Sequence, residues 1–83
     1  MSVNNQSIKE RIAKDINLFE ENIKRVKKDA FANQNLDIII DLAIRYYNDA
    51  KYYLEKRDYF TSFGCINYAH GLLDAILKRG GLE

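Results

Sequence analysis

Apolar residues recur at steps of three and four through the first part of the chain, from Ile8 to Ala30. At about 100° per residue, this spacing places them in one narrow stripe along an α-helix. Most of the other residues in the segment are charged, so one side of the helix is expected to face a core and the other side water. The stripe consists of Ile8, Ile12, Ile16, Phe19, Ile23, Val26 and Ala30.

Two further stripes with the same helical period follow. Short polar breaks separate the three segments, and the sequence has no proline and only four glycines to interrupt helices. The sequence therefore predicts helices over approximately residues 7–31, 36–56 and 59–79. The second stripe comprises Leu36, Ile40, Ala43, Tyr47, Ala50 and Leu54, and the third comprises Tyr59, Phe63, Ile66, Leu73 and Leu77.

Polar residues mark the expected helix ends. The run SIKE, from Ser7 to Glu10, is typical of a capping box, in which Ser7 is the N-cap of the first helix. Asn35 and Asp58 are the expected N-caps of the second and third helices, and Gly80 suits the position after the last helix.

Short connections force successive helices to run antiparallel. The sequence therefore predicts an all-α fold, an antiparallel up-down-up three-helix bundle that forms a single domain over residues 1–83. The 47% hydrophobic content is normal for a globular chain and too high for disorder.

Composition disfavours several classes of partner. The 13 basic and 12 acidic residues leave a formal charge of +1, whereas general nucleic-acid binders usually carry a strong basic excess. No run approaches the roughly 18 apolar residues of a membrane span, so no membrane partner is expected. One cysteine excludes an internal disulfide and a multi-cysteine metal cage, and it fits a reducing cytoplasm.

His70 is the only histidine, with Asn67 one turn before it and Asp74 one turn after it. An Asp-oriented imidazole that acts as a base or metal ligand is one hypothesis. The alternative is a half-buried histidine whose ring bonds to Asp74, Asn67 or a tyrosine across the helix interface. We favour this polar cluster of Asn67, His70 and Asp74, because a single histidine makes a poor metal site. We assign no catalytic, cofactor-binding or metal-binding residue. Cys65 is interpreted as a small buried hydrophobic residue.

Gly64 and Gly71 share one helical face with Phe60 and Asn67. Glycine inside a helix costs roughly 0.5–1 kcal/mol relative to alanine, so two on one face suggest a steric reason. Either the first helix packs closely there, which we expect, or a partner lies against a shallow groove.

Three apolar residues fall on the polar faces of their helices and are candidate contact residues. Together with Phe60, Gly64, Asn67 and Gly71, they form the predicted interaction face; they are Ile38, Tyr52 and Tyr68. The basic run Lys24–Lys28 raises the alternative of RNA contact with help from neighbouring tyrosines, but its charges spread around the helix.

The segment RYYNDAKYYLEKRDYFTSFGCINYAHGLLDAIL, from Arg45 to Leu77, resembles a small archaeal family, domain-of-unknown-function family 357. The resemblance rests on the tyrosine-rich start, the LEKRDYFTSF hinge and the INYAHGLLDA run. It implies a compact three-helix bundle in an archaeal cytoplasm, with no assigned activity. The hinge also looks like one tetratricopeptide unit, but the first helix does not repeat that pattern. Helical nucleotide-binding domains of the toxin ribonuclease type carry an Arg six residues before a His, where this chain has Gly64.

These observations predict a non-enzymatic protein-interaction or assembly module without a cofactor. The partner is an unidentified protein or a second copy of the chain. The alternative is an RNA- or nucleotide-associated helical domain.

Overall fold

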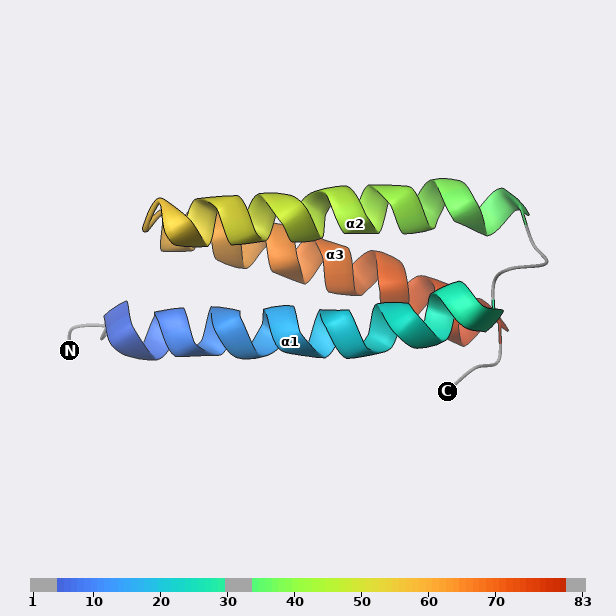
Figure 1. Cartoon of the computed structure of the whole chain (residues 1–83), viewed down its shortest axis with the longest axis horizontal. Helices are drawn as coiled ribbons and strands as arrows, with labels where there is room; N and C mark the ends of the chain where they lie inside the picture. The colour runs from blue at the N-terminus through green and yellow to red at the C-terminus, as the bar shows by residue number, and fades with distance from the viewer. Residues whose placement is uncertain (1–4, 30–33, 81–83) are drawn as a thin grey trace.

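The protein consists of three α-helices in the computed structural model, which describes residues 5–29 and 34–80, with side chains from 7 to 26 and from 36 to 77. They are α1 (Asn5–Asp29), α2 (Gln34–Glu55) and α3 (Tyr59–Gly80), and the described ranges contain no strand. The all-α three-helix bundle is therefore confirmed. In Figure 1, α1 and α3 run in the same direction and α2 runs in the opposite direction.

The helix ends depart slightly from the predicted ones. α1 begins at Asn5, so Ser7 lies inside the helix and the predicted capping box is wrong; nothing between Asn5 and Ser7 breaks a helix. α2 begins at Gln34, so Asn35 lies inside that helix rather than before it. Gly80 is the last helical residue of α3, and residues 30–31 lie outside the described residues.

The turn between α2 and α3 is defined by backbone hydrogen bonds. The amide of Asp58 donates to the Tyr53 carbonyl at 2.9 Å, and the amide of Arg57 donates to the Leu54 carbonyl at 3.0 Å. This pair of bonds is the Schellman motif, and Arg57 adopts the left-handed conformation that it requires, with φ 64°. The Thr61 amide donates to Asp58 Oδ1 at 3.2 Å, so the predicted N-cap of α3 is confirmed.

α2 and α3 pack together most extensively, α1 contacts α3 less, and α1 contacts α2 least. Small buried residues allow the close approach of α2 and α3: Ala43 and Ala50 on one helix, Ser62 and Ala69 on the other. The Ser62 hydroxyl donates to the Ala50 carbonyl at 2.6 Å, which satisfies the buried Ser62 side chain. The buried core consists of Ile12, Ile16, Phe19, Val26, Ile40, Ala43, Ala50, Ile66, Ala69, Leu73, Ile76 and Leu77.

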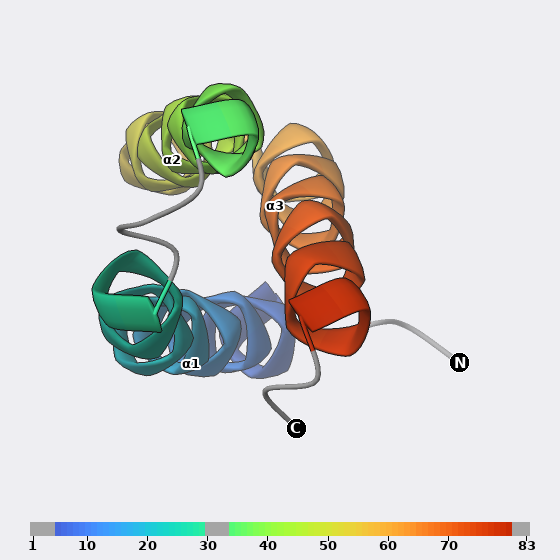
Figure 2. The ribbon, with the colours of Figure 1, turned by 90° about the vertical axis from the view of Figure 1, so that its right-hand side faces the viewer.

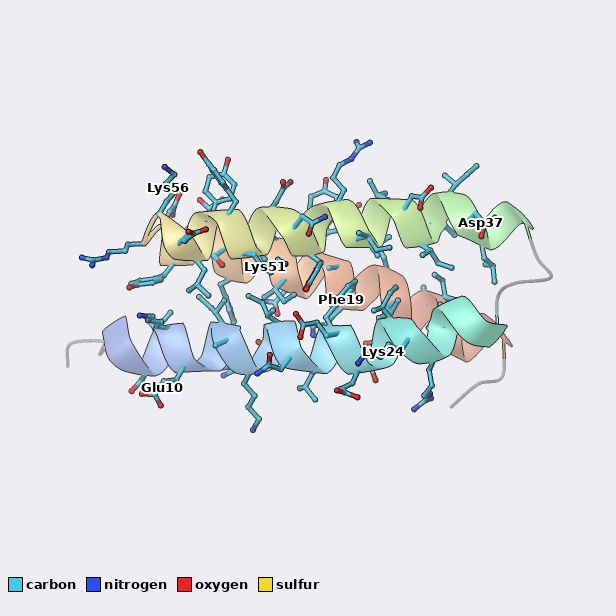
Figure 3. All side chains as sticks on the ribbon, viewed as in Figure 1. Glu10, Phe19, Lys24, Asp37, Lys51 and Lys56 are labelled. Carbon is cyan, nitrogen blue, oxygen red and sulfur yellow. The ribbon has the colours of Figure 1, made fainter. Side chains whose placement is uncertain are left out.

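An aromatic layer, formed by Phe19, Tyr47 and His70, joins the three helices near the middle of the bundle. The Phe19 ring is fully buried; it stacks on Tyr47 at 4.9 Å between centroids and meets His70 edge-on at 5.8 Å. The Tyr47 hydroxyl donates to Glu20 Oε2 at 2.5 Å, and Lys51 Nζ lies 4.7 Å from the Tyr47 ring centroid. Figure 3 shows Phe19 and Lys51 in the space between α1 and α2.

Candidate interaction surface

One side of α3 is turned away from α1 and α2. Figure 2 looks along the bundle and shows both other helices on the left of α3, with its right-hand side turned away from them. We call this side the α3 outer face. Its members are all exposed, and they are Phe60, Gly64, Asn67, Tyr68, Gly71, Asp74 and Ala75.

The α3 outer face carries almost no charge. Asp74 is its single charged residue, although 30% of the chain is charged. Most exposed positions of the other two helices are charged, so among the described side chains the exposed charges lie mainly on α1 and α2. Exposed charged residues on α1 and α2 are Lys9, Glu10, Arg11, Lys14, Glu21, Lys24, Arg25, Asp37, Asp41, Arg45, Lys51 and Glu55. A helix face depleted of charge is typical of the centre of a protein interface.

Gly64 and Gly71 do not face α1, so the expectation of close internal packing is wrong. A Cβ added at either position would meet no atom within 4 Å. α1 lies against a different side of α3, where the His70 ring contacts Phe19. Two helical glycines, each costing roughly 0.5–1 kcal/mol, therefore have no steric explanation among the described residues.

We expect Gly64→Ala and Gly71→Ala each to raise the free energy of unfolding by roughly 0.5–1 kcal/mol. Alanine restricts the unfolded chain and meets no obstacle in the helix. Urea denaturation followed by circular dichroism measures the change. Ala75→Gly, an exposed position on the same face, is the matched control and should lower stability by a similar amount. If both alanine variants were less stable than the wild type, the glycines would have a structural role inside the monomer.

Phe60 is the most exposed large hydrophobic residue of the α3 outer face, with 92% of its surface accessible. It also borders a shallow groove of about 1070 Å³ at the end of the bundle where α1 and α3 begin. Half-buried Ile8 and Phe63 line this groove, and exposed Arg11 places its guanidinium carbon 5.7 Å from the Phe63 ring centroid. Sequence reasoning missed the groove, because it depends on how the starts of two helices are set side by side.

The structure brings only part of the predicted interaction face together. Tyr68 lies beside the glycines on α3, and its ring stacks on Tyr46 of α2 at 4.5 Å. Ile38 is 75% exposed and Tyr52 is 54% exposed, but both are on α2, about 21 Å apart along the helix axis. Exposed charged Arg45 lies between them in the sequence, so these two residues are isolated apolar positions. Isolated exposed apolar residues are common on protein surfaces and indicate no site.

His70 is half-buried, as predicted, but its partner differs from the predicted ones. Its Nε2 lies 2.7 Å from the backbone carbonyl oxygen of Asp15 on α1, so this nitrogen carries the proton and donates. Asn67 and Asp74 are instead exposed members of the α3 outer face. The polar cluster of these three residues is therefore replaced by a hydrogen bond that ties α3 to α1.

Cys65 is half-buried near the α2–α3 seam. Burial raises the pKa of its thiol, and the negative charges of Asp49 and Asp58 raise that pKa further. The thiol is consequently protonated at neutral pH and is a poor nucleophile.

Residues suited to metal or nucleic-acid chemistry are dispersed. Within residues 7–26 and 36–77, no three His, Cys, Asp or Glu side chains are grouped closely enough to hold a metal ion. In the basic run, Lys24 and Arg25 are exposed and Val26 is buried, while the side chains of residues 27 and 28 lie outside the described ones. None of the described helices has the length and apolarity needed to cross a membrane.

Comparison with known proteins gives one informative result. No curated protein matches the chain. A family model described as "Protein of unknown function (DUF357)" matches residues 14–82, which is well over half of the chain and includes parts of all three helices. The chain therefore belongs to the DUF357 family, whose function is unknown.

Proposed function

We propose that this chain is a non-enzymatic protein-interaction module and that the α3 outer face is its docking surface. The observation that carries this proposal is the combination of Phe60, 92% exposed, with two helical glycines at which an added Cβ would meet no atom within 4 Å. A fully exposed phenylalanine beside a flat, uncharged strip gives a partner both an aromatic anchor and close access to the helix backbone.

The electrostatic arrangement supports the same function. The exposed charges are concentrated on α1 and α2, which keeps those helices hydrated, whereas the α3 outer face loses little hydration on contact. The two half-buried reactive side chains have a structural explanation. The His70 imidazole donates a hydrogen bond to a backbone carbonyl, and burial raises the pKa of the Cys65 thiol. The single cysteine supports a reducing compartment such as the cytoplasm.

The test compares surface variants of the full chain as affinity baits in an extract of the native organism. We expect Phe60→Ser and Gly71→Leu to lose the same bound proteins, because the first removes the anchor and the second raises a bulky side chain from the flat strip. Ile38→Ser removes a similarly exposed apolar side chain from α2 and should keep them. Circular dichroism must show unchanged helicity for all three variants.

Salt distinguishes this proposal from the nucleic-acid alternative. A docking face with a single charge should hold its partner between about 50 and 200 mM salt, whereas RNA binding weakens steeply over that range. Binding that depends equally on Ile38 and Phe60, or that disappears on nuclease treatment, would contradict the proposal.

A further inference from the structure

We propose that the α3 outer face binds the same face of a second copy of this chain. The two α3 helices are antiparallel, and the two-fold axis crosses them midway between residues 65 and 66 along the helix. This inference rests on the proposed function and identifies its partner. In a two-fold interface, the same patch serves both subunits, so each residue must suit the one that the symmetry places opposite it. The sequence of the α3 outer face meets that condition in shape and in charge.

Four residues of the α3 outer face form a seam, and in an antiparallel pair of helices this seam is complementary to a second copy of itself. Phe60, Gly64, Asn67 and Gly71 follow one another at steps of four, three and four, which is the spacing of a helix–helix seam. Phe60 and Gly71 are equally far from residues 65 and 66, and so are Gly64 and Asn67. Antiparallel pairing therefore places Phe60 opposite the partner's Gly71 and Gly64 opposite the partner's Asn67.

This register sets a large side chain against an empty position at both ends of the seam. Phe60 is 92% exposed, and the position of a Cβ on Gly71 has no neighbouring atom within 4 Å. The partner's phenylalanine ring can therefore lie directly on the α3 backbone, and large residues opposite small ones allow two helices to interlock. The same pairing explains why the chain keeps a glycine at both positions at a cost in helix stability.

Charge supports the antiparallel direction. Asp74 is the single charge of the α3 outer face, and it lies near one end of the seam. Antiparallel pairing separates the two Asp74 carboxylates by about 25 Å along the helix axes. A parallel, in-register pair would instead set Asp74 against Asp74 and Phe60 against Phe60, which combines like charges with two bulky rings.

The arrangement leaves the rest of the bundle undisturbed. α1 and α2 both lie to the left of α3 in Figure 2, and the buried residues of α3 face them, so the α3 outer face is the side of this helix open to a second copy. α3 has 22 residues and is about 33 Å long. A contact along one helix from each copy is smaller than a standard interface of ~1,600 Å², so we expect weak, reversible association with a dissociation constant in the micromolar range or above.

Sedimentation of the full chain from about 5 μM to 1 mM tests the association, because that range spans the expected dissociation constant. We expect a monomer–dimer equilibrium that Phe60→Ser and Gly71→Leu each weaken by roughly tenfold or more. Asn48→Leu adds the same leucine at an exposed position of α2 and should leave the equilibrium unchanged. A wild type that stays monomeric at 1 mM would overturn the second-copy inference. The proposed function would still stand if Phe60-dependent capture of another protein persisted.

Exchange of side-chain size tests the register itself. Gly71→Phe alone should weaken self-association, because it sets two phenylalanines opposite each other at both ends of the seam, and Phe60→Gly alone should weaken it by removing the ring. An equimolar mixture of these two variants should dimerise better than either variant alone, since each phenylalanine then faces a glycine. Dimerisation without recovery in the mixture would show that another register or another face is used.

Discussion

Phe19→Ala is expected to lower the free energy of unfolding by roughly 3–5 kcal/mol. The Phe19 ring is fully buried and contacts rings from both other helices, stacking on Tyr47 and meeting His70 edge-on. Its removal leaves a cavity in the aromatic layer, where Phe19 joins all three helices. Urea denaturation followed by circular dichroism measures the loss.

Two matched variants separate the ring contacts from simple volume. Phe19→Leu keeps much of the apolar volume and should cost clearly less than Phe19→Ala. Leu18→Ala removes an apolar side chain from the next position of α1, where it is 47% exposed, and should change stability by less than about 1 kcal/mol. A small loss for Phe19→Ala, comparable to that of Leu18→Ala, would mean that α1 is not anchored through this layer.

His70→Ala is expected to lower the free energy of unfolding by about 2 kcal/mol. The variant loses the hydrogen bond from Nε2 to the Asp15 carbonyl and the edge-on contact with Phe19, two links between α3 and α1. A catalytic histidine would behave in the opposite way, with stability unchanged and an activity abolished. The same denaturation experiment therefore distinguishes a structural imidazole from a functional one.

His70→Phe and His70→Gln divide the effect between packing and hydrogen bonding. Phenylalanine keeps a ring against Phe19 without a donor, and glutamine keeps a donor without a ring. Each should recover part of the stability that alanine loses. Because His70 and Phe19 are in contact, the double variant Phe19→Ala/His70→Ala should lose less than the sum of the single losses. No recovery of stability by either variant, together with an additive double loss, would contradict the aromatic layer.

Local sequence signals were sufficient to predict the three helices and the position of the turn between α2 and α3. The apolar period located three helices, and Asp58 was identified as an N-cap from its residue type and position, which its bond to the Thr61 amide confirms. The start of α1 was predicted two residues too late, because a sequence that matches a capping box can also lie inside a helix that begins earlier. No glycine marked Arg57 as left-handed, since the Schellman bonds hold a non-glycine residue in that conformation.

Features that depend on the rotation of α3 in the bundle could not be predicted. The spacing of Gly64 and Gly71 shows that they share a face, but it does not say whether that face is turned toward α1 or toward solvent. That choice is made by the residues on the other sides of α3, which pack against two helices at once. The partner of His70 is equally non-local, because a backbone carbonyl 55 residues away has no signature in the sequence.

The most direct measurement of the central account is photo-crosslinking in cells of the native organism from a benzoyl-phenylalanine at position 60. This residue is a close replacement for an exposed phenylalanine, and the same probe at Ile38 serves as the control on α2. The account predicts discrete protein adducts from position 60, lost when Gly71→Leu is added, and few or none from position 38. Equal labelling from both positions, or adducts from neither, would contradict a docking surface on α3.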